Sequence, residues 1–143
     1  MDTQSQMETS SSPPYGFTTK LMGRSLAEAR ASVEQALKEQ EFGVLTEIDV
    51  QATFKKKLGA EFRPYLILGV CNPKLAQRAL SDDLGVGLLL PCNIVLWGED
   101  DGTVVSIADP QAMFQVVHDP RLQPIADEAA RRLRAAFASL RAQ

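Results

Sequence analysis

The chain has 143 residues, of which 45% are hydrophobic and 23% are charged. This length and balance are typical of one globular domain with its own core, and they exclude a fibrous or wholly disordered protein. The net charge of −3 gives no broad positive field, so we expect no nucleic-acid partner. No apolar stretch reaches the length of a membrane span, so we expect no membrane partner either.

The start of the chain differs in composition from the rest. Residues 1–13 are polar and rich in Ser and Thr, with almost no bulky apolar side chains. We therefore predict a disordered tail at 1–13 and a single domain at 14–143. The tail lacks the cationic and apolar segments of a secretory signal, which favours a cytoplasmic protein whose two cysteines are free thiols.

The next segments predict a strand, a helix and a second strand. Apolar and small residues alternate over 15–20, as in a strand. Ser25 and Glu28 then fit a capping box that starts a helix, and Gly43 is suited to close that helix after residue 41 or 42. Alternation over 44–50 predicts a second strand with one better-buried face.

A short amphipathic helix is expected after the second strand. Asp49 is placed to cap it, and Gly59 is placed to end it. Val50, Phe54 and Leu58 recur four residues apart, which predicts one inward-facing side.

Two similar junctions contain the only cysteines in the chain. The apolar run 65–71 predicts an interior strand covered on both faces, and Asn72 and Pro73 then form a strong helix start. Residues 87–90 and 92–97 read as two halves of one strand, interrupted at Pro91 because proline cannot donate to a sheet ladder.

The last third of the chain predicts a hairpin followed by helices. Residues 98–102 form the hairpin loop, Asp109 and Pro110 start a short helix, and residues 124–141 form a long amphipathic helix. Strands and helices thus interleave along the chain. The predicted fold class is α+β, with a mixed, largely antiparallel sheet covered by helices in a single domain.

These segments together resemble the DUF302 family, a family of uncharacterised domains, over about residues 15–140. The matching segments are Lys55 to Gly59 (KKKLG), Tyr65 to Pro73 (YLILGVCNP), Leu75-Ala76, and Gly87 to Val95 (GLLLPCNIV). The resemblance implies an α+β domain in which helices pack on a largely antiparallel sheet, and it implies a homodimer. It implies no activity and no catalytic residue.

The thiols of Cys71 and Cys92 have two interpretations. Cys71 lies just before a helix start, where the positive end of the helix dipole favours a thiolate, and Cys92 would then be a resolving partner or a second reactive thiol. Alternatively, both side chains are small hydrophobic groups packed in the sheet. Desolvation in that case raises the pKa of each thiol.

His118, the only histidine, also has two interpretations. It is a candidate general base oriented by Asp119, or it is an ordinary residue of a surface connection. The cysteines have no CxxC spacing and few other donors, so we predict no metal site. The residues point to no particular cofactor.

The leading functional hypothesis is a homodimeric small-ligand-binding or regulatory module. The candidate ligand site consists of Cys71, Asn72, Pro91, Cys92 and Asn93, although Asn72 also has a sufficient role as a helix cap. One alternative is a thiol-dependent enzyme or redox sensor that uses Cys71 and Cys92. Another is a protein–protein assembly module in which the apolar segment of Ile94, Leu96 and Trp97 forms an edge interface.

Overall fold

In the part of the chain that the structure describes, five strands form one sheet in the order β1-β5-β4-β3-β2, and every neighbouring pair is antiparallel. The computed structural model describes residues 12–143. The strands are β1 (Gly16–Met22), β2 (Gly43–Asp49), β3 (Tyr65–Cys71), β4 (Cys92–Glu99) and β5 (Gly102–Ala108). The predicted α+β class with a largely antiparallel sheet is confirmed.

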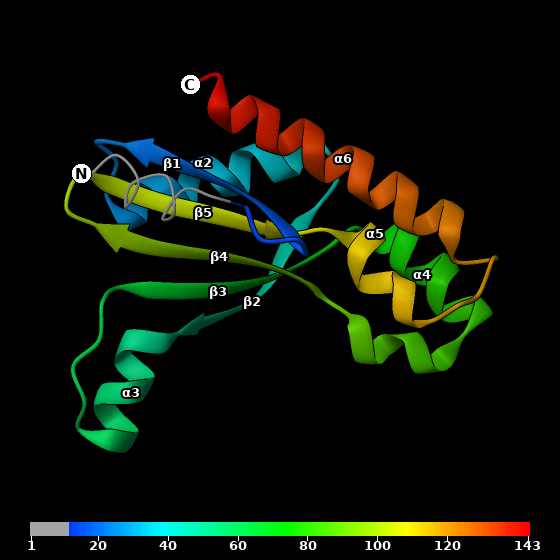
Figure 1. Ribbon diagram of the computed structural model, residues 1–143, viewed down its shortest axis with the longest axis horizontal. Coiled ribbons are helices and arrows are strands. Elements are labelled where there is room, and N and C mark those ends of the chain that lie inside the picture. The colour runs from blue at the N-terminus through cyan, green and yellow to red at the C-terminus, as the bar shows by residue number, and fades with distance from the viewer. Residues whose placement is uncertain (1–11) are drawn as a thin grey trace.

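The helices gather mainly on one face and at one end of the sheet. They are α2 (Leu26–Glu39), α3 (Val50–Leu58), α4 (Pro73–Asp82), the 3-10 segment η1 (Leu84–Leu89), α5 (Pro110–Met113), the 3-10 segment η2 (Phe114–Val116) and α6 (Gln123–Arg141). Figure 1 shows α2 and α6 along the sheet, α4 and α5 beyond one end, and α3 projecting from the opposite end.

The core lies between the sheet and the helices α2 and α6. Apolar strand residues of one face are buried against buried helix residues such as Val33 and Leu133. The strand residues of this face are Phe17, Leu21, Leu68, Val70, Ile94, Leu96, Val105 and Ile107. Burial of these side chains supplies the main stabilisation of the fold, at about 25 cal/mol for each Å² of apolar surface removed from water.

The second face of the sheet carries half-buried aromatic and β-branched residues. Tyr65 stacks on Trp97 with ring centroids 5.8 Å apart, and Ile67 is paired in register with Val95. Within residues 12–143, the helices that contribute to the core cluster pack on the other face. The prediction that β3 is covered on both faces is therefore wrong, because Tyr65 and Ile67 are only partly buried.

The predicted helix starts are confirmed by their hydrogen bonds. The Glu28 amide donates to Ser25 Oγ at 3.1 Å, and the Ser25 amide donates to Glu28 Oε1 at 2.9 Å. The Ala52 amide donates to Asp49 Oδ1 at 2.9 Å, and Gly59 ends α3 with φ +63°. These local signals act within a few residues, so they could be read directly from the sequence.

Two local predictions are wrong in the first half of the chain. Glu41, with φ +65°, takes the left-handed conformation after α2, whereas Gly43 begins β2. The predicted inward side of α3 is not buried, since α3 has no buried residue. β2 is the edge strand of the sheet and is mostly exposed, so its neighbour α3 has little core to join.

The segment before Pro91 is also corrected. Residues 84–89 form the 3-10 segment η1 instead of a half-strand, and Leu90–Pro91 is a cis peptide bond. The strand begins only at Cys92. The apolar run at 87–90 is an irregular segment, of which Leu89 and Leu90 pack against the core. Apolar composition alone does not distinguish such a segment from a buried strand.

The predicted tail falls almost wholly outside the described residues, which begin at Ser12. Within the described part, the Thr18 amide donates to Ser12 Oγ at 2.7 Å, and the Gly16 amide donates to the Pro13 carbonyl at 3.1 Å. Residues 12 and 13 thus contact the start of β1.

Candidate functional site

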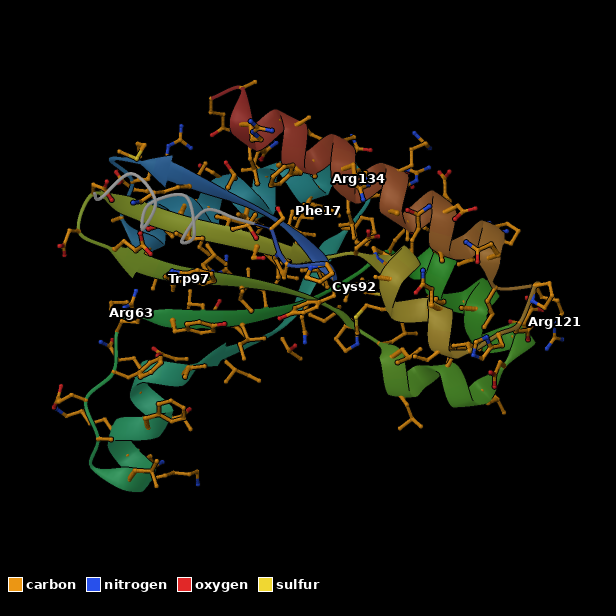
Figure 2. The ribbon with its side chains drawn as sticks, viewed as in Figure 1. Phe17, Arg63, Cys92, Trp97, Arg121 and Arg134 are labelled. Carbon is orange, nitrogen blue, oxygen red and sulfur yellow. The ribbon has the colours of Figure 1, made fainter. Side chains whose placement is uncertain are left out.

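The two Cys-Asn junctions lie side by side at one end of the sheet. Strands β3 and β4 are antiparallel neighbours, and Val70 is paired in register with Cys92. The end of β3 therefore meets the start of β4, and Figure 2 shows Cys92 at the end of β4 opposite to Trp97. The predicted clustering of the junctions follows from this pairing.

A small apolar hollow, which we call the inner cavity, lies beyond this end of the sheet. It is bordered by Cys71, Asn72 and Cys92 together with apolar residues that include Leu75 and Leu90. Its volume is about 30 Å³. One water molecule needs about 10–15 Å³ of such space, so the inner cavity has room for roughly two.

A larger hollow adjoins the inner cavity, and we call it the outer groove. It has a volume of about 210 Å³, and no charged residue is among those that line it. Its lining is Leu88, Leu89, Leu90, Pro91, Cys92, Asn93, Ala108, Pro110, Met113 and Phe114. The outer groove shares four of these residues with the inner cavity: Leu90, Cys92, Pro110 and Phe114.

A third hollow, which we call the charged basin, shares part of its lining with the inner cavity. It is open to solvent, has a volume of about 440 Å³ and is lined by Glu41, Asn72, Lys74, Leu75, Arg78, Pro124, Glu128 and Arg132. It shares Asn72 and Leu75 with the inner cavity. The inner cavity thus shares lining residues with each of the other two hollows.

The five predicted ligand residues are distributed over these hollows. Cys71 and Asn72 border the inner cavity, whereas Pro91 and Asn93 border the outer groove. Cys92 borders both hollows. The structure brings all five residues to one end of the sheet, but in neighbouring hollows instead of one pocket.

The two thiols are next to each other in the sheet but differ in orientation. Cys92 is paired with Val70, and side chains alternate between faces along a strand, so the side chain of Cys71 points to the opposite face from that of Cys92. Cysteines whose Cβ vectors point apart cannot be bridged without backbone movement. Both are free thiols.

Burial holds both thiols in the protonated form. Desolvation raises the pKa of Cys92 from 9.0 to about 11, and the neighbouring Cys71 adds to this shift. Desolvation also raises the pKa of Cys71. A thiolate is the nucleophilic form of cysteine, so this environment does not activate either sulfur at neutral pH.

His118 lies away from these hollows. It follows η2 with φ +55°, is exposed, and borders none of the three hollows. Asp119, its predicted orienting partner, accepts hydrogen bonds from the Arg121 guanidinium, with the Arg121 Nη2 atom 2.8 Å from Asp119 Oδ2. This pairing lowers the pKa of the Asp119 carboxyl.

Metal ligands do not converge in the described part of the chain. Residues 12–143 contain no group of three or more His, Cys, Asp or Glu side chains with the geometry to hold a metal ion. No helix among these residues is long and apolar enough to cross a membrane.

Sequence reasoning missed the rim of the outer groove and every residue of the charged basin except Asn72. Leu88 is 93% exposed and Met113 is 39% exposed, so two large apolar side chains at this groove face solvent. A single exposed apolar side chain does not indicate a binding site, whereas a patch of such side chains does. The patch at this groove is formed by η1 and α5, which are far apart in the sequence.

The fold and these hollows define a single-domain α+β protein with an antiparallel sheet that carries its main helices on one face. The family model for DUF302, a domain of unknown function, matches residues 17–140. The chain therefore belongs to the DUF302 family.

A solved structure supports this assignment. The crystal structure of an uncharacterised conserved DUF302 protein from Bacillus stearothermophilus is similar over 89% of this chain and 98% of that chain, with 32% identity and a TM-score of 0.80. A comparison with curated proteins found no match.

Proposed function

We propose that this domain is a small-ligand-binding or regulatory module whose ligand occupies the outer groove. The observation that carries the proposal is the groove itself, which has a volume of about 210 Å³, a lining without charged residues and exposed apolar side chains at Leu88 and Met113. Ligand sites are concave and mostly apolar, with a few polar groups for orientation. Asn93 is such a polar group here.

A thiol-dependent enzyme or redox sensor has less support from the same site. Both cysteines have raised pKa values, and the register directs their side chains to opposite faces of the sheet. In the binding proposal, Cys92 is a small polarisable wall between the outer groove and the inner cavity. The free thiols also suit a reducing compartment, which is why we propose a cytoplasmic location.

The binding proposal is tested with 1-octanol, an uncharged ligand with an apolar chain. Titration followed by ¹H–¹⁵N NMR is expected to shift the amides of Leu89, Cys92 and Met113. Ala108→Phe adds a ring to the lining of the groove and is expected to weaken octanol binding at least tenfold.

Ala52→Phe is the matched control, because Ala52 is exposed on α3 and borders none of the three hollows. It is expected to leave the affinity for octanol unchanged. Shifts spread over the whole surface, or an Ala108→Phe variant that binds octanol as tightly as the wild type, would contradict the proposal.

A second candidate function is assembly with another copy of the chain, and the second face of the sheet favours it. That face carries Tyr65, Ile67, Val95 and Trp97 as half-buried residues, and Ile48 is 49% exposed beside them. An exposed apolar patch is typical of an interaction surface. We propose a homodimer through this face.

A further inference from the structure

The helix α3 has an apolar stripe that residues 12–143 leave largely uncovered. Val50, Phe54 and Leu58 recur at intervals of four residues, but no residue of α3 is buried. Leu58 is 73% exposed, and Phe62 in the loop after α3 is 43% exposed. A helix as short as α3 is marginal in water without packing on its apolar side. The stripe is therefore a surface that a partner would cover.

Aromatic rings join this stripe to the second face of the sheet. The ring of Phe54 packs on that of Phe62 with centroids 5.1 Å apart, and Phe62 lies 6.3 Å from Tyr65. Tyr65 in turn stacks on Trp97. The apolar surface is thus continuous from α3 across β3 to β4, so a partner that covers the second face also meets α3.

The strand order decides which elements meet when two copies pack through this face. The apolar residues of the second face lie on β2, β3 and β4, with β3 in the middle. Identical surfaces of a dimer are related by a two-fold axis, so a contact centred on these residues places the axis at β3. Packed sheets keep their strands nearly aligned, so this axis runs either along β3 or across it.

An axis along β3 brings α3 of each copy to the β4–β5 hairpin of the other. In this arrangement β2 of one copy faces β4 of the partner, because β2 and β4 lie on opposite sides of β3. The end of β2, from which α3 projects, lies at the same end of the sheet as the β4–β5 turn (Figure 1). An axis across β3 would instead place α3 at the far end of the partner's sheet.

The charges of these two elements favour the axis along β3. Residues 55–57 are three lysines, and α3 contains no acidic residue. Residues 99–101 of the hairpin are all acidic. Lys20 pairs with the first and the last of them, whereas Asp100 is exposed and forms no ion pair with residues 12–143. Opposite charges on facing elements fix the orientation of an interface.

The position of each lysine around α3 shows which one borders the apolar stripe. Successive helix residues are rotated by about 100°, so Lys57 lies beside Phe54, and Lys56 lies on the opposite side of the helix. Lys55 pairs with Glu61 at 3.4 Å, whereas Lys57 is exposed and has no ion pair within residues 12–143. Lys57 is thus the cation at the edge of the surface that a partner would cover.

We infer that the partner is a second copy of this chain, related by a two-fold axis along β3, and that Lys57 of each copy contacts Asp100 of the partner subunit. The two equivalent contacts lie at the rim of an apolar interface. This inference rests on the proposed assembly function and specifies the geometry of the dimer.

The test is a charge exchange, measured by sedimentation velocity of the full chain at pH 7 in 50 mM NaCl. Lys57→Glu and Asp100→Lys are each expected to raise the dimer dissociation constant at least fivefold, because each puts like charges together at both contacts. Both side chains are exposed, so the monomers are expected to stay folded. The double variant restores opposite charges and is expected to dimerise within about twofold of the wild type.

Two controls change the charge by the same amount elsewhere. Lys56→Glu alters the side of α3 that faces away from the stripe, and Asp82→Lys alters an exposed position in α4. Both are expected to leave the dissociation constant within about twofold of the wild type.

The possible failures can be told apart. The inference is overturned, and assembly through this face stands, if Ile48→Lys separates the dimer but neither Lys57→Glu nor Asp100→Lys weakens it. It is also overturned if the double variant is as weak as the single variants, or if Lys56→Glu acts as strongly as Lys57→Glu. If the wild type is monomeric at tens of micromolar, the assembly function fails, and the inference fails with it.

Discussion

At the scale of single residues, Cys92 shows how an apolar setting controls a reactive group. Cys92 borders both the inner cavity and the outer groove, and no residue that lines either hollow is charged. The low dielectric constant disfavours the thiolate, and the pKa rises to about 11. The same neighbours that make the site suitable for an apolar ligand therefore make the sulfur unreactive.

This raised pKa predicts a loss of stability at alkaline pH. Below pH 9 the thiol is protonated in both the folded and the unfolded chain, so it contributes no pH dependence. Between pH 9 and 11 the unfolded thiol ionises while the folded one keeps its proton, so the free energy of unfolding falls by about 2 kcal/mol by pH 11.

Urea denaturation at pH 8 and pH 11 measures this effect. Between pH 8 and pH 11, the free energy of unfolding is expected to fall by about 2 kcal/mol more for the wild type than for Cys92→Ala. Cys71→Ala is the control and is expected to behave much like the wild type, because Cys71 is only half-buried. Equal losses in the wild type and in Cys92→Ala would show that the Cys92 thiol does not have the raised pKa.

At the scale of elements, Gly69 in β3 allows the segment that contains Pro91 to lie close to this strand. A Cβ atom built on Gly69 would lie 2.7 Å from Pro91 Cγ and would also overlap Thr46 Oγ1 of β2. Gly69 thus leaves room for the Pro91 ring to lie against the strand, next to the start of β4. This contact helps to shape the wall of the outer groove, which Pro91 borders.

Gly69→Ala is therefore expected to destabilise the domain by about 1–3 kcal/mol, because the added methyl group overpacks this junction. The measurement is the midpoint of urea unfolding. Gly43→Ala in the neighbouring strand β2 is a matched control, since a Cβ atom there meets no heavy atom within 4 Å. A Gly69→Ala variant as stable as Gly43→Ala would mean that Pro91 does not rest on β3.

At the scale of the whole molecule, the sheet has two unlike faces. One face forms the core with α2 and α6, and the other presents the stacked rings of Tyr65 and Trp97 among half-buried aliphatic residues. Figure 2 shows Trp97 near the end of β4 that is remote from Cys92.

The proposed dimer predicts that a charge on this face separates the two copies. Ile48→Lys is expected to raise the dimer dissociation constant at least tenfold in sedimentation velocity, because it would place a charge in an apolar interface. Ile48 is 49% exposed, so the monomer is expected to stay folded. Leu84→Lys on η1, where the side chain is 85% exposed, is the control. A wild-type chain that is monomeric at tens of micromolar would contradict the dimer.

Much of the fold was predictable because its signals are local. The caps at Ser25, Asp49 and Asn72 each act over three residues, and the hairpin between β4 and β5 joins neighbouring strands. The sequence also indicated that the two Cys-Asn junctions belong together. It was misleading at residues 87–90, which were predicted as a half-strand, whereas residues 84–89 form the 3-10 segment η1.

The sequence by itself determined the α+β class, the order of most elements, the helix caps and the family. Only the tertiary structure decided which face of the sheet is covered, which direction each thiol points and which residues border each hollow. The reason is physical: caps and periodicity depend on neighbours a few residues away, whereas the charged basin joins Glu41, Asn72, Arg78 and Glu128 from distant parts of the chain. Side-chain direction in β3 and β4 likewise depends on a register that pairs Val70 with Cys92.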